Sequence, residues 1–258
     1  MATRLSGHPL IELDSVDSTN KYAADRLHLP ELQHGTVILA HEQTQGRGQR
    51  ERTWSSNKGL DLTFSLVLRP KGLKAAGQFV LAKVAALAVH AAVVDALRAA
   101  SGLGVGAVHI KWPNDVLIGD RKVAGILIHS ELAGERITAS IVGIGLNVNS
   151  SELHAAPGAT SLRNEVGHAL DRLALLEDLL ARFDAWWGRA STAPGEVDAA
   201  YAAQLWGRDR AMDLELDGVP FSGVPVDVDP AGRLRVRDLS GTEQAYGLDR
   251  LRFVPRYQ

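Results

Sequence analysis

The residues best suited to chemistry lie in one short glycine- and arginine-rich stretch, residues 46–54. Two glycines two positions apart, Gly46 and Gly48, let a backbone turn sharply and approach a ligand closely. The arginines of this stretch add planar, permanently charged donors that suit carboxylate or phosphate groups. Trp54 offers an apolar wall or a stacking face. A solvated basic turn would have the same composition, so this stretch alone leaves a structural and a functional interpretation open.

A second polar group, residues 111–115, follows an apolar run and reads Lys-Trp-Pro-Asn-Asp. The Trp-Pro pair favours an extended backbone before a bend. A lysine, an amide and a carboxylate then project from one strand end. Lys122 comes eleven residues after Lys111 and begins the next apolar run, so a hairpin can bring both amines to one site. Taken alone, Asn-Asp after Pro is also ordinary turn chemistry.

Strands and helices must position these groups, and the periodicity of apolar residues predicts both. Residues 36–40 indicate a buried strand, and alternation over 60–68 indicates a half-buried one. Further strands are expected at 108–112, 116–118, 123–131 and 137–148, with a hairpin turn at Gly119-Asp120. Successive strands joined by tight turns favour an antiparallel or mixed sheet over βαβ repeats.

Helices are expected in three places. Residues 78–100 indicate a long, largely buried helix with His90 packed in the core, and 171–187 a second helix. A third begins near Ser18 or Thr19, one of which caps it. Residues 1–13 read as a short lead-in. Beyond a boundary near residue 206 the pattern changes to short strands typical of a small β-barrel, which predicts domains at 1–206 and 207–258.

Composition narrows the classes of function. The chain has 258 residues, a formal net charge of −2 and no cysteine. The charge provides no global basic field for nucleic acid or an anionic membrane. The lack of cysteine excludes disulfides and thiolate chemistry. The apolar run at 79–97 is interrupted by charged residues, and the N-terminus lacks the apolar core of a signal peptide. We expect a cytoplasmic protein without membrane or DNA partners.

Five motifs in order resemble those of the biotin protein ligases. They are an Asp-Ser-Thr-Asn helix start at 17–20, the Gly-Arg-Gly loop with its tryptophan, Lys-Trp-Pro-Asn-Asp, Lys-Val-Ala-Gly-Ile-Leu at 122–127, and Gly-Ile-Gly-Leu-Asn-Val-Asn at 143–149. The resemblance implies an α/β (α+β) fold. Its catalytic domain has a mixed, largely antiparallel sheet similar to class II aminoacyl-tRNA synthetases, and a small SH3-like domain follows.

The resemblance also implies two half-reactions with ATP and biotin as substrates and Mg²⁺ as cofactor. The biotin carboxylate attacks the α-phosphate of ATP to give biotinyl-5′-adenylate. A lysine of a biotin carboxyl carrier domain then takes the biotinyl group. A homodimer is a further possibility in this family. Attack of one anion on another needs charge neutralisation and alignment, which Arg47, Lys111, Lys122 and Mg²⁺ would supply.

Site residues follow from the same motif positions. The resemblance implies biotin contacts from Ser18, Thr19, Asn20, Gln43, Gly46, Arg47, Gly48, Gln49, Lys122 and Gly125. It implies nucleotide contacts from Arg47, Trp54, Lys111, Asn114 and Asn147, with Trp54 packing against the adenine. The expected catalytic groups are Arg47, Lys111, Asp115 and Lys122, and no protein-based metal site is expected. A role for Asp115 as base toward the incoming amine is a hypothesis.

The chain departs from the family pattern in two ways. Gln49 stands where the loop often carries arginine, and Glu51 stands where glycine is common, which raises a question about how the intermediate is retained. Nothing before residue 9 suggests a helix-turn-helix, so we expect the ligase-only type. The rival interpretations are a lipoate–protein ligase, which shares fold and chemistry, and a biotin-sensing binding or regulatory protein.

Overall fold

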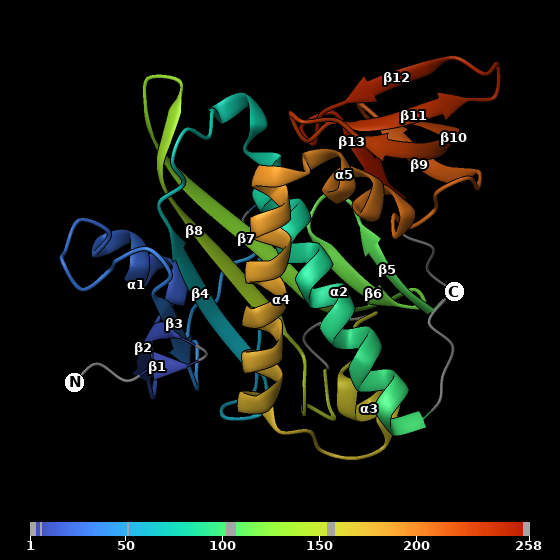
Figure 1. Ribbon diagram of the computed structural model, residues 1–258. Helices are drawn as coiled ribbons and strands as arrows, with labels where there is room; N and C mark the ends of the chain where they lie inside the picture. The colour runs from blue at the N-terminus through green and yellow to red at the C-terminus, as the bar shows by residue number, and fades with distance from the viewer. Residues whose placement is uncertain (1–3, 6, 51, 102–106, 154–157, 255–258) are drawn as a thin grey trace.

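An eight-stranded sheet forms the centre of the molecule (Figure 1). The computed structural model describes residues 4–5, 7–50, 52–101, 107–153 and 158–254. The strand order is β1-β2-β3-β4-β8-β7-β6-β5; β2 and β3 run parallel and the other neighbouring pairs antiparallel. The strands are β1 (Arg4–Leu5), β2 (His8–Leu13), β3 (Val37–Ala40), β4 (Leu62–Leu68), β5 (Val108–Lys111), β6 (Asp115–Ile118), β7 (Arg121–Ala133) and β8 (Arg136–Leu146). The prediction of a mixed, largely antiparallel sheet is confirmed.

Helices cover both faces of this sheet. They are α1 (Thr19–Asp25), α2 (Phe79–Ser101), α3 (Leu162–Val166), α4 (Arg172–Thr192) and α5 (Pro194–Ala203), with a 3-10 turn at Ala75–Gly77. The α2 helix packs between the sheet and α4, whereas α1 packs on the opposite face over β3, β4 and β8. By length and composition the segment 75–99 could span a membrane, but 78% of its most apolar window is buried. It is the core helix that the sequence predicts, and His90 is buried within it.

The β4 strand is buried along its whole length, which corrects the expectation of a half-buried strand. It lies between β3 and β8, and its alternate side chains contact the helices on the two faces. The polar members of the alternation do not face solvent. Thr63 donates to the carbonyl of Ala40, and Ser65 contacts residues at the start of α1.

Two local expectations at the N-terminus are wrong. Residues 1–13 are not only a lead-in, because β1 and β2 lie there and β2 pairs in parallel with β3. Ser18 occupies the N-cap position of α1, but its side chain makes no capping hydrogen bond, and Thr19 is already helical. Both side chains are buried and line a pocket instead.

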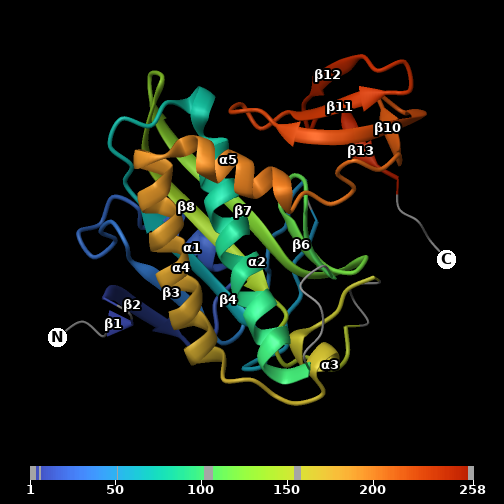
Figure 2. The same ribbon diagram turned by 45° about the vertical axis from the view of Figure 1, so that its right-hand side comes forward.

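The C-terminal strands form a separate five-stranded antiparallel sheet (Figure 2). They are β9 (Met212–Leu216), β10 (Val219–Val228), β11 (Leu234–Asp238), β12 (Glu243–Tyr246) and β13 (Leu251–Phe253). Two polar side chains of the main body bind this sheet. Lys83, on α2, donates to Asp198 Oδ1 and to the Val228 carbonyl, both at 2.7 Å. Trp112 Nε1 donates to the Gly232 carbonyl at 2.9 Å. The hydrophobic core runs without a break from α2 into β9, β10 and β11.

Candidate active site

Three cavities meet beside the glycine–arginine loop. The sheet pocket lies between the start of α1, this loop, β7 and β8. The basic cavity contains Arg50, Arg52, Lys111 and Arg252 and faces β13. The cleft separates β7 and the start of α2 from two turns of the C-terminal sheet. Gln49 and Asn114 line all three, so a ligand with several chemically distinct parts could occupy connected spaces here.

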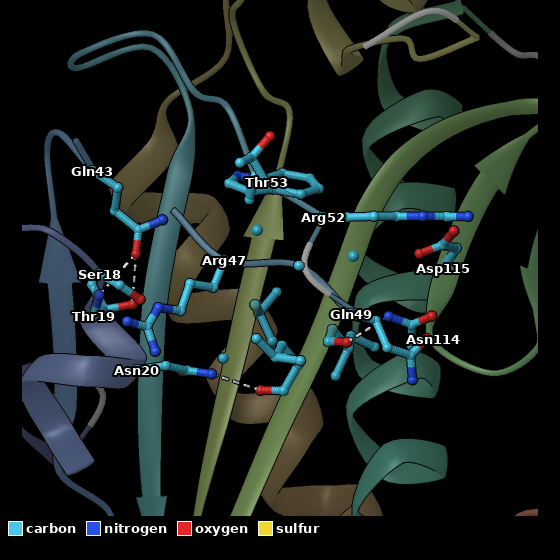
Figure 3. A pocket seen from close by; sticks show the side chains of 18 of the residues that line it. Ser18, Thr19, Asn20, Gln43, Arg47, Gln49, Arg52, Thr53, Asn114 and Asp115 are labelled. Atoms are coloured by element: carbon cyan, nitrogen blue, oxygen red, sulfur yellow. Dashed lines mark hydrogen bonds between the residues drawn. The ribbon is translucent and has the colours of Figure 1, made fainter. Parts of the chain in front are cut away.

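One end of the sheet pocket is lined by hydrogen-bonding groups from three elements. Gln43 follows β3, and its Oε1 accepts from the Thr19 backbone N–H at 2.8 Å and from the Thr19 hydroxyl at 3.1 Å. Asn20 donates through Nδ2 to the Leu127 carbonyl at 2.9 Å. Figure 3 shows the Arg47 guanidinium pointing toward this end from the loop. These neutral groups with one cation suit a compact polar ligand that both donates and accepts hydrogen bonds.

Close backbone contacts hold the loop over the pocket. Trp54 N donates to the Gly46 carbonyl at 2.9 Å, and Gly48 N donates to the Arg52 carbonyl at 2.6 Å. A Cβ on Gly46 would stand 2.3 Å from the carbonyl oxygen of Trp54, so this position requires glycine. Arg50 adopts a positive φ of 52° at the tip. Glu51 lies outside the described residues.

The Trp54 indole packs directly on the backbone of two glycines in the pocket wall. A Cβ on Gly145 would lie 2.3 Å from the indole ring, and one on Gly125 would lie 3.1 Å from it. The indole Nε1 is buried without a partner among the described residues. Lys122 Nζ lies 5.5 Å from the centre of the ring. The tryptophan thus contacts the wall of the sheet pocket, and its expected packing against an adenine stays a prediction.

Charged groups gather where the sheet pocket meets the basic cavity. Asp115 lines both spaces, and its Oδ1 lies 2.6 Å from Lys122 Nζ. Lys111 lines only the basic cavity, with Nζ 5.0 Å from the Trp206 ring and 5.7 Å from that of Phe253. Burial lowers the pKa of Lys111, and Asp115 partly opposes this shift. The hairpin therefore brings the two amines to adjoining spaces on either side of one carboxylate.

The structure places most of the expected residues together, but three lie elsewhere. Of the residues expected from the motifs, the sheet pocket is lined by Ser18, Thr19, Asn20, Gln43, Arg47, Gly48, Gln49, Trp54, Asn114, Asp115, Lys122 and Gly125. Gly46 supports the loop, and Lys111 faces the basic cavity. Within the described chain, Asn147 is not part of the lining of the three cavities. It is buried and donates to the Thr160 carbonyl at 3.0 Å.

Sequence reasoning missed several pocket residues. Arg52 and Thr53 belong to the loop, while Gly143 and Gly145 belong to the Gly-Ile-Gly motif without having been chosen as contacts. The two glycines carried a signal in the sequence, because a glycine within a strand marks close approach by a side chain or a ligand. Phe64 gave no signal beyond that of an apolar strand residue.

Comparison with known proteins agrees with this geometry. Residues 12–147 match the biotin/lipoate A/B protein ligase family. A biotin–[acetyl-CoA-carboxylase] ligase of Paracoccus denitrificans is 42% identical over 241 residues, which cover 90% of this chain and 95% of that protein. A bifunctional ligase/repressor of Bacillus spizizenii is 32% identical, covering 96% of this chain and 75% of that protein.

A solved structure supports the same relationship. The biotin protein ligase of Aquifex aeolicus, in complex with biotin and ATP, superimposes with a TM-score of 0.75 at 28% identity, covering 95% of this chain and 99% of that one. The family match, the relatives and the shared fold agree with the resemblance carried by the five motifs. The chain belongs to the biotin/lipoate A/B protein ligase family, among its biotin protein ligases.

Proposed function

We propose that the protein attaches biotin to a lysine of a biotin carboxyl carrier domain in two ATP-dependent steps. One observation carries the proposal: the sheet pocket, with its neutral polar end, opens beside the Lys122–Asp115 pair onto a cavity rich in arginine and lysine. This arrangement suits a ligand with a polar ring at one end and a carboxylate at the other, next to a polyphosphate. The relatives named as biotin–[acetyl-CoA-carboxylase] ligases support the same activity.

In the first step, an oxygen of the biotin carboxylate attacks the α-phosphorus of ATP, and pyrophosphate leaves with the electron pair of the broken P–O bond. Lys122 and Arg47 would neutralise the two anions, and Gln49 and Asn114 would orient the groups where the three spaces meet. The basic cavity, at about 510 Å³, and the cleft, at about 600 Å³, fall within the range of about 300–1,000 Å³ typical of ligand sites. They offer room for the nucleotide.

In the second step, the carrier lysine attacks the acyl carbon of biotinyl-5′-adenylate, an amide forms and AMP leaves. A free lysine has a pKa of about 10.4 and must lose its proton before or during attack. Asp115 is the one carboxylate among the described residues that line the sheet pocket, and we propose it as the group that orients or accepts from this amine. Because Lys122 is its partner at 2.6 Å, that role requires the pair to separate or share the incoming amine.

Mg²⁺ fits the chemistry of the basic cavity. Sites of this kind hold Mg²⁺ through one or two carboxylates and the substrate phosphates, and Asp115 and Glu215 both line the cavity. When bound, the ion neutralises phosphate charge. We place the enzyme in the cytoplasm and retain a homodimer as a proposal. We also retain the division into domains 1–206 and 207–258.

One experiment tests the proposed activity. The purified chain is incubated with ATP, Mg²⁺, labelled biotin and an apo carrier domain, and the carrier is then examined for label. Labelled carrier with biotin-dependent pyrophosphate release is the expected result. Equal pyrophosphate release with lipoate would favour the lipoate–protein ligase alternative. Retention of biotin without pyrophosphate release would favour a binding or regulatory protein.

A further inference from the structure

A short segment of backbone lies beside Lys122 where the neighbouring strand of the main sheet ends. The β8 strand, which pairs with β7, ends at Leu146. Residues 158–160 lie in parallel pairing beside Lys122, near the start of β7. The Lys122 N–H donates to the Gly158 carbonyl at 2.9 Å, and the Lys122 carbonyl accepts from the Thr160 N–H at 2.8 Å. Both backbone groups of Lys122 are therefore held by this segment.

The strand on the other side of Lys122 supports its backbone less regularly. In the β6–β7 ladder the register shifts between Val116 and Leu117, so β7 carries one residue more than β6 at Val123. Such a bulge interrupts the ladder locally and increases the twist of the strand. The direction in which Lys122 projects its side chain thus depends on the pairing with residues 158–160.

Glu165, on α3, connects this segment to β7. Its Oε1 accepts a hydrogen bond from the Thr160 hydroxyl and lies 2.8 Å from Arg121 Nη2, and its Oε2 accepts from the same guanidinium at 3.0 Å. Only 9% of the Glu165 side chain is exposed, and Thr160 is buried. Since Thr160 belongs to the segment and Arg121 directly precedes Lys122, one carboxylate joins the two backbones that meet at this lysine.

The place of Glu165 is fixed by the two ends of its short helix. Ser161 caps the start of α3 through its side chain, and Gly167 ends the helix in the left-handed conformation with a φ of 84°. Glu165 and its two side-chain partners are absent from the described linings of the sheet pocket, the basic cavity and the cleft. An influence of Glu165 on the reaction would therefore have to pass through Lys122 rather than through contact with a substrate.

We propose that Glu165 is a positioning residue for Lys122. It holds residues 158–160 against β7, and this segment holds the Lys122 backbone so that the ammonium lies beside Asp115 and the expected substrate carboxylate. The proposal deepens the function above and rests on it. Misplacing a reacting group by about 1 Å can lower a rate on the order of a hundredfold, so the support of Lys122 affects the chemistry and not only the fold.

The test compares variants that remove or keep the hydrogen bond between Thr160 and Glu165. This bond should matter more than the ion pair, because the Arg121 side chain is more than half exposed and exposed pairs contribute little. Thr160→Val and Glu165→Ala remove the bond, whereas Thr160→Ser and Glu165→Gln keep a donor and an acceptor. Biotin-dependent pyrophosphate release is measured for each variant, alone and combined with Lys122→Ala. The control Glu243→Ala removes a carboxylate that pairs with arginines of the C-terminal sheet.

We expect Thr160→Val and Glu165→Ala to lower kcat for pyrophosphate release by between about tenfold and a hundredfold, with little change in the KM for biotin. Combined with Lys122→Ala, the same substitutions should change the remaining rate by less than about twofold, because the group that they position is gone. Thr160→Ser, Glu165→Gln and Glu243→Ala should each stay within about twofold of the wild-type rate.

Three results would overturn the inference. The first is an unchanged kcat in Thr160→Val and Glu165→Ala; Thr160→Val decides alone if Glu165→Ala does not fold. The second is a loss by the same factor with and without Lys122, which indicates a general loss of packing. The third is a wild-type rate in Lys122→Ala, since this lysine would then have no role to support. A wild-type protein that releases no pyrophosphate with biotin would instead contradict the proposed function itself, and that outcome is read before any variant is compared.

Discussion

The ammonium of Lys122 and the carboxylate of Asp115 form an ion pair of 2.6 Å in the wall shared by the sheet pocket and the basic cavity. The pair joins β6 to β7 across two residues that do not face each other directly in the ladder, since Asp115 pairs with Gly125. The Lys122 side chain therefore extends toward the C-terminal end of its strand, over the bare backbone of Gly125 and toward Trp54. The Lys122 ammonium thus lies beside the place where we expect the substrate carboxylate.

Replacing Lys122 should mainly affect the first half-reaction. Loss of one charged donor in a transition state lowers rates by about a hundred- to thousandfold, and we expect Lys122→Ala to slow pyrophosphate release by this amount. The control is Lys21→Ala, because Lys21 forms exposed ion pairs with Asp17 and Asp25 on α1. Biotin-dependent pyrophosphate release near the wild-type rate in Lys122→Ala would contradict the role.

Gly145 should not tolerate a side chain. Gly145→Ala places a methyl group within 2.3 Å of the Trp54 indole, so the ring and the loop that carries it must move. We expect a higher KM for biotin with a largely unchanged melting temperature. The control Gly188→Ala adds a methyl group in open space on α4 and should raise helix stability slightly. A crystal structure of Gly145→Ala with Trp54 in place and KM unchanged would count against this account.

Gln49 should influence retention of the intermediate because it lines all three cavities. An arginine here would add a charge-assisted hydrogen bond worth about 1.5–3 kcal/mol, against about 1 kcal/mol for the neutral amide. We expect Gln49→Arg to slow release of preformed biotinyl-adenylate, measured by rapid dilution, and Arg47→Ala to accelerate it. If Gln49→Arg leaves the rate unchanged or raises it, the loop closes without charge at this position.

His90 should make the fold sensitive to mild acid. Burial lowers the pKa of its imidazole, partly opposed by the hydrogen bond to the Val108 carbonyl. Below its ordinary pKa the unfolded chain binds this proton more readily than the folded protein, so the free energy of unfolding falls as pH drops through about 6.5. We expect His90→Gln to lose less stability between pH 7 and pH 5 than the wild-type protein, in urea titrations. The exposed His168→Gln should match the wild-type slope.

Lys111 should support ATP-dependent turnover but lower the free energy of unfolding. Burial is the main reason that its pKa is lowered from the ordinary value of 10.5. The folded state therefore binds the proton less tightly than the unfolded chain, and the free energy of unfolding rises with pH from the lowered pKa toward 10.5. Lys111→Met should raise the melting temperature at pH 7, by an amount that shrinks toward pH 10, and should impair ATP-dependent turnover. A lower melting temperature at pH 7 would show that contacts with Trp206 and Phe253 outweigh the burial of charge.

Local patterns predicted the strands that follow one another through tight turns. The β5 to β8 ladder is of this kind, because each turn fixes which strands are neighbours. The pairing of β4 with β8 joins segments far apart in sequence, and no local pattern specifies it. This is why Ser65 read as a solvent-facing residue of an alternating strand. Its polarity is satisfied inside the protein by residues that only the fold brings close.

The sequence predicted those site residues that belong to short motifs. The twelve expected residues that line the sheet pocket come from the start of α1, the segment after β3, the loop, the turn into β6, β6 itself and β7, and their roles remain predictions. Ser18 takes the N-cap position of α1, one of the two positions expected, but its buried hydroxyl lines the pocket and makes no capping hydrogen bond. Asn147 looked equally polar in sequence, but its amide is used inside the protein on the Thr160 carbonyl.

The ammonium of Lys83 limits how this protein can recombine with its relatives. Only 2% of its side chain is exposed, and the Val228 carbonyl of the C-terminal sheet is one of its two oxygen partners. A C-terminal sheet taken from another family member would remove the Val228 carbonyl from the Lys83 ammonium unless that sheet placed an oxygen at the same point. Loss of a partner for a buried charge is strongly destabilising. Viable crossovers are therefore those that exchange α2 and the C-terminal sheet together, or that first replace Lys83 with an apolar residue.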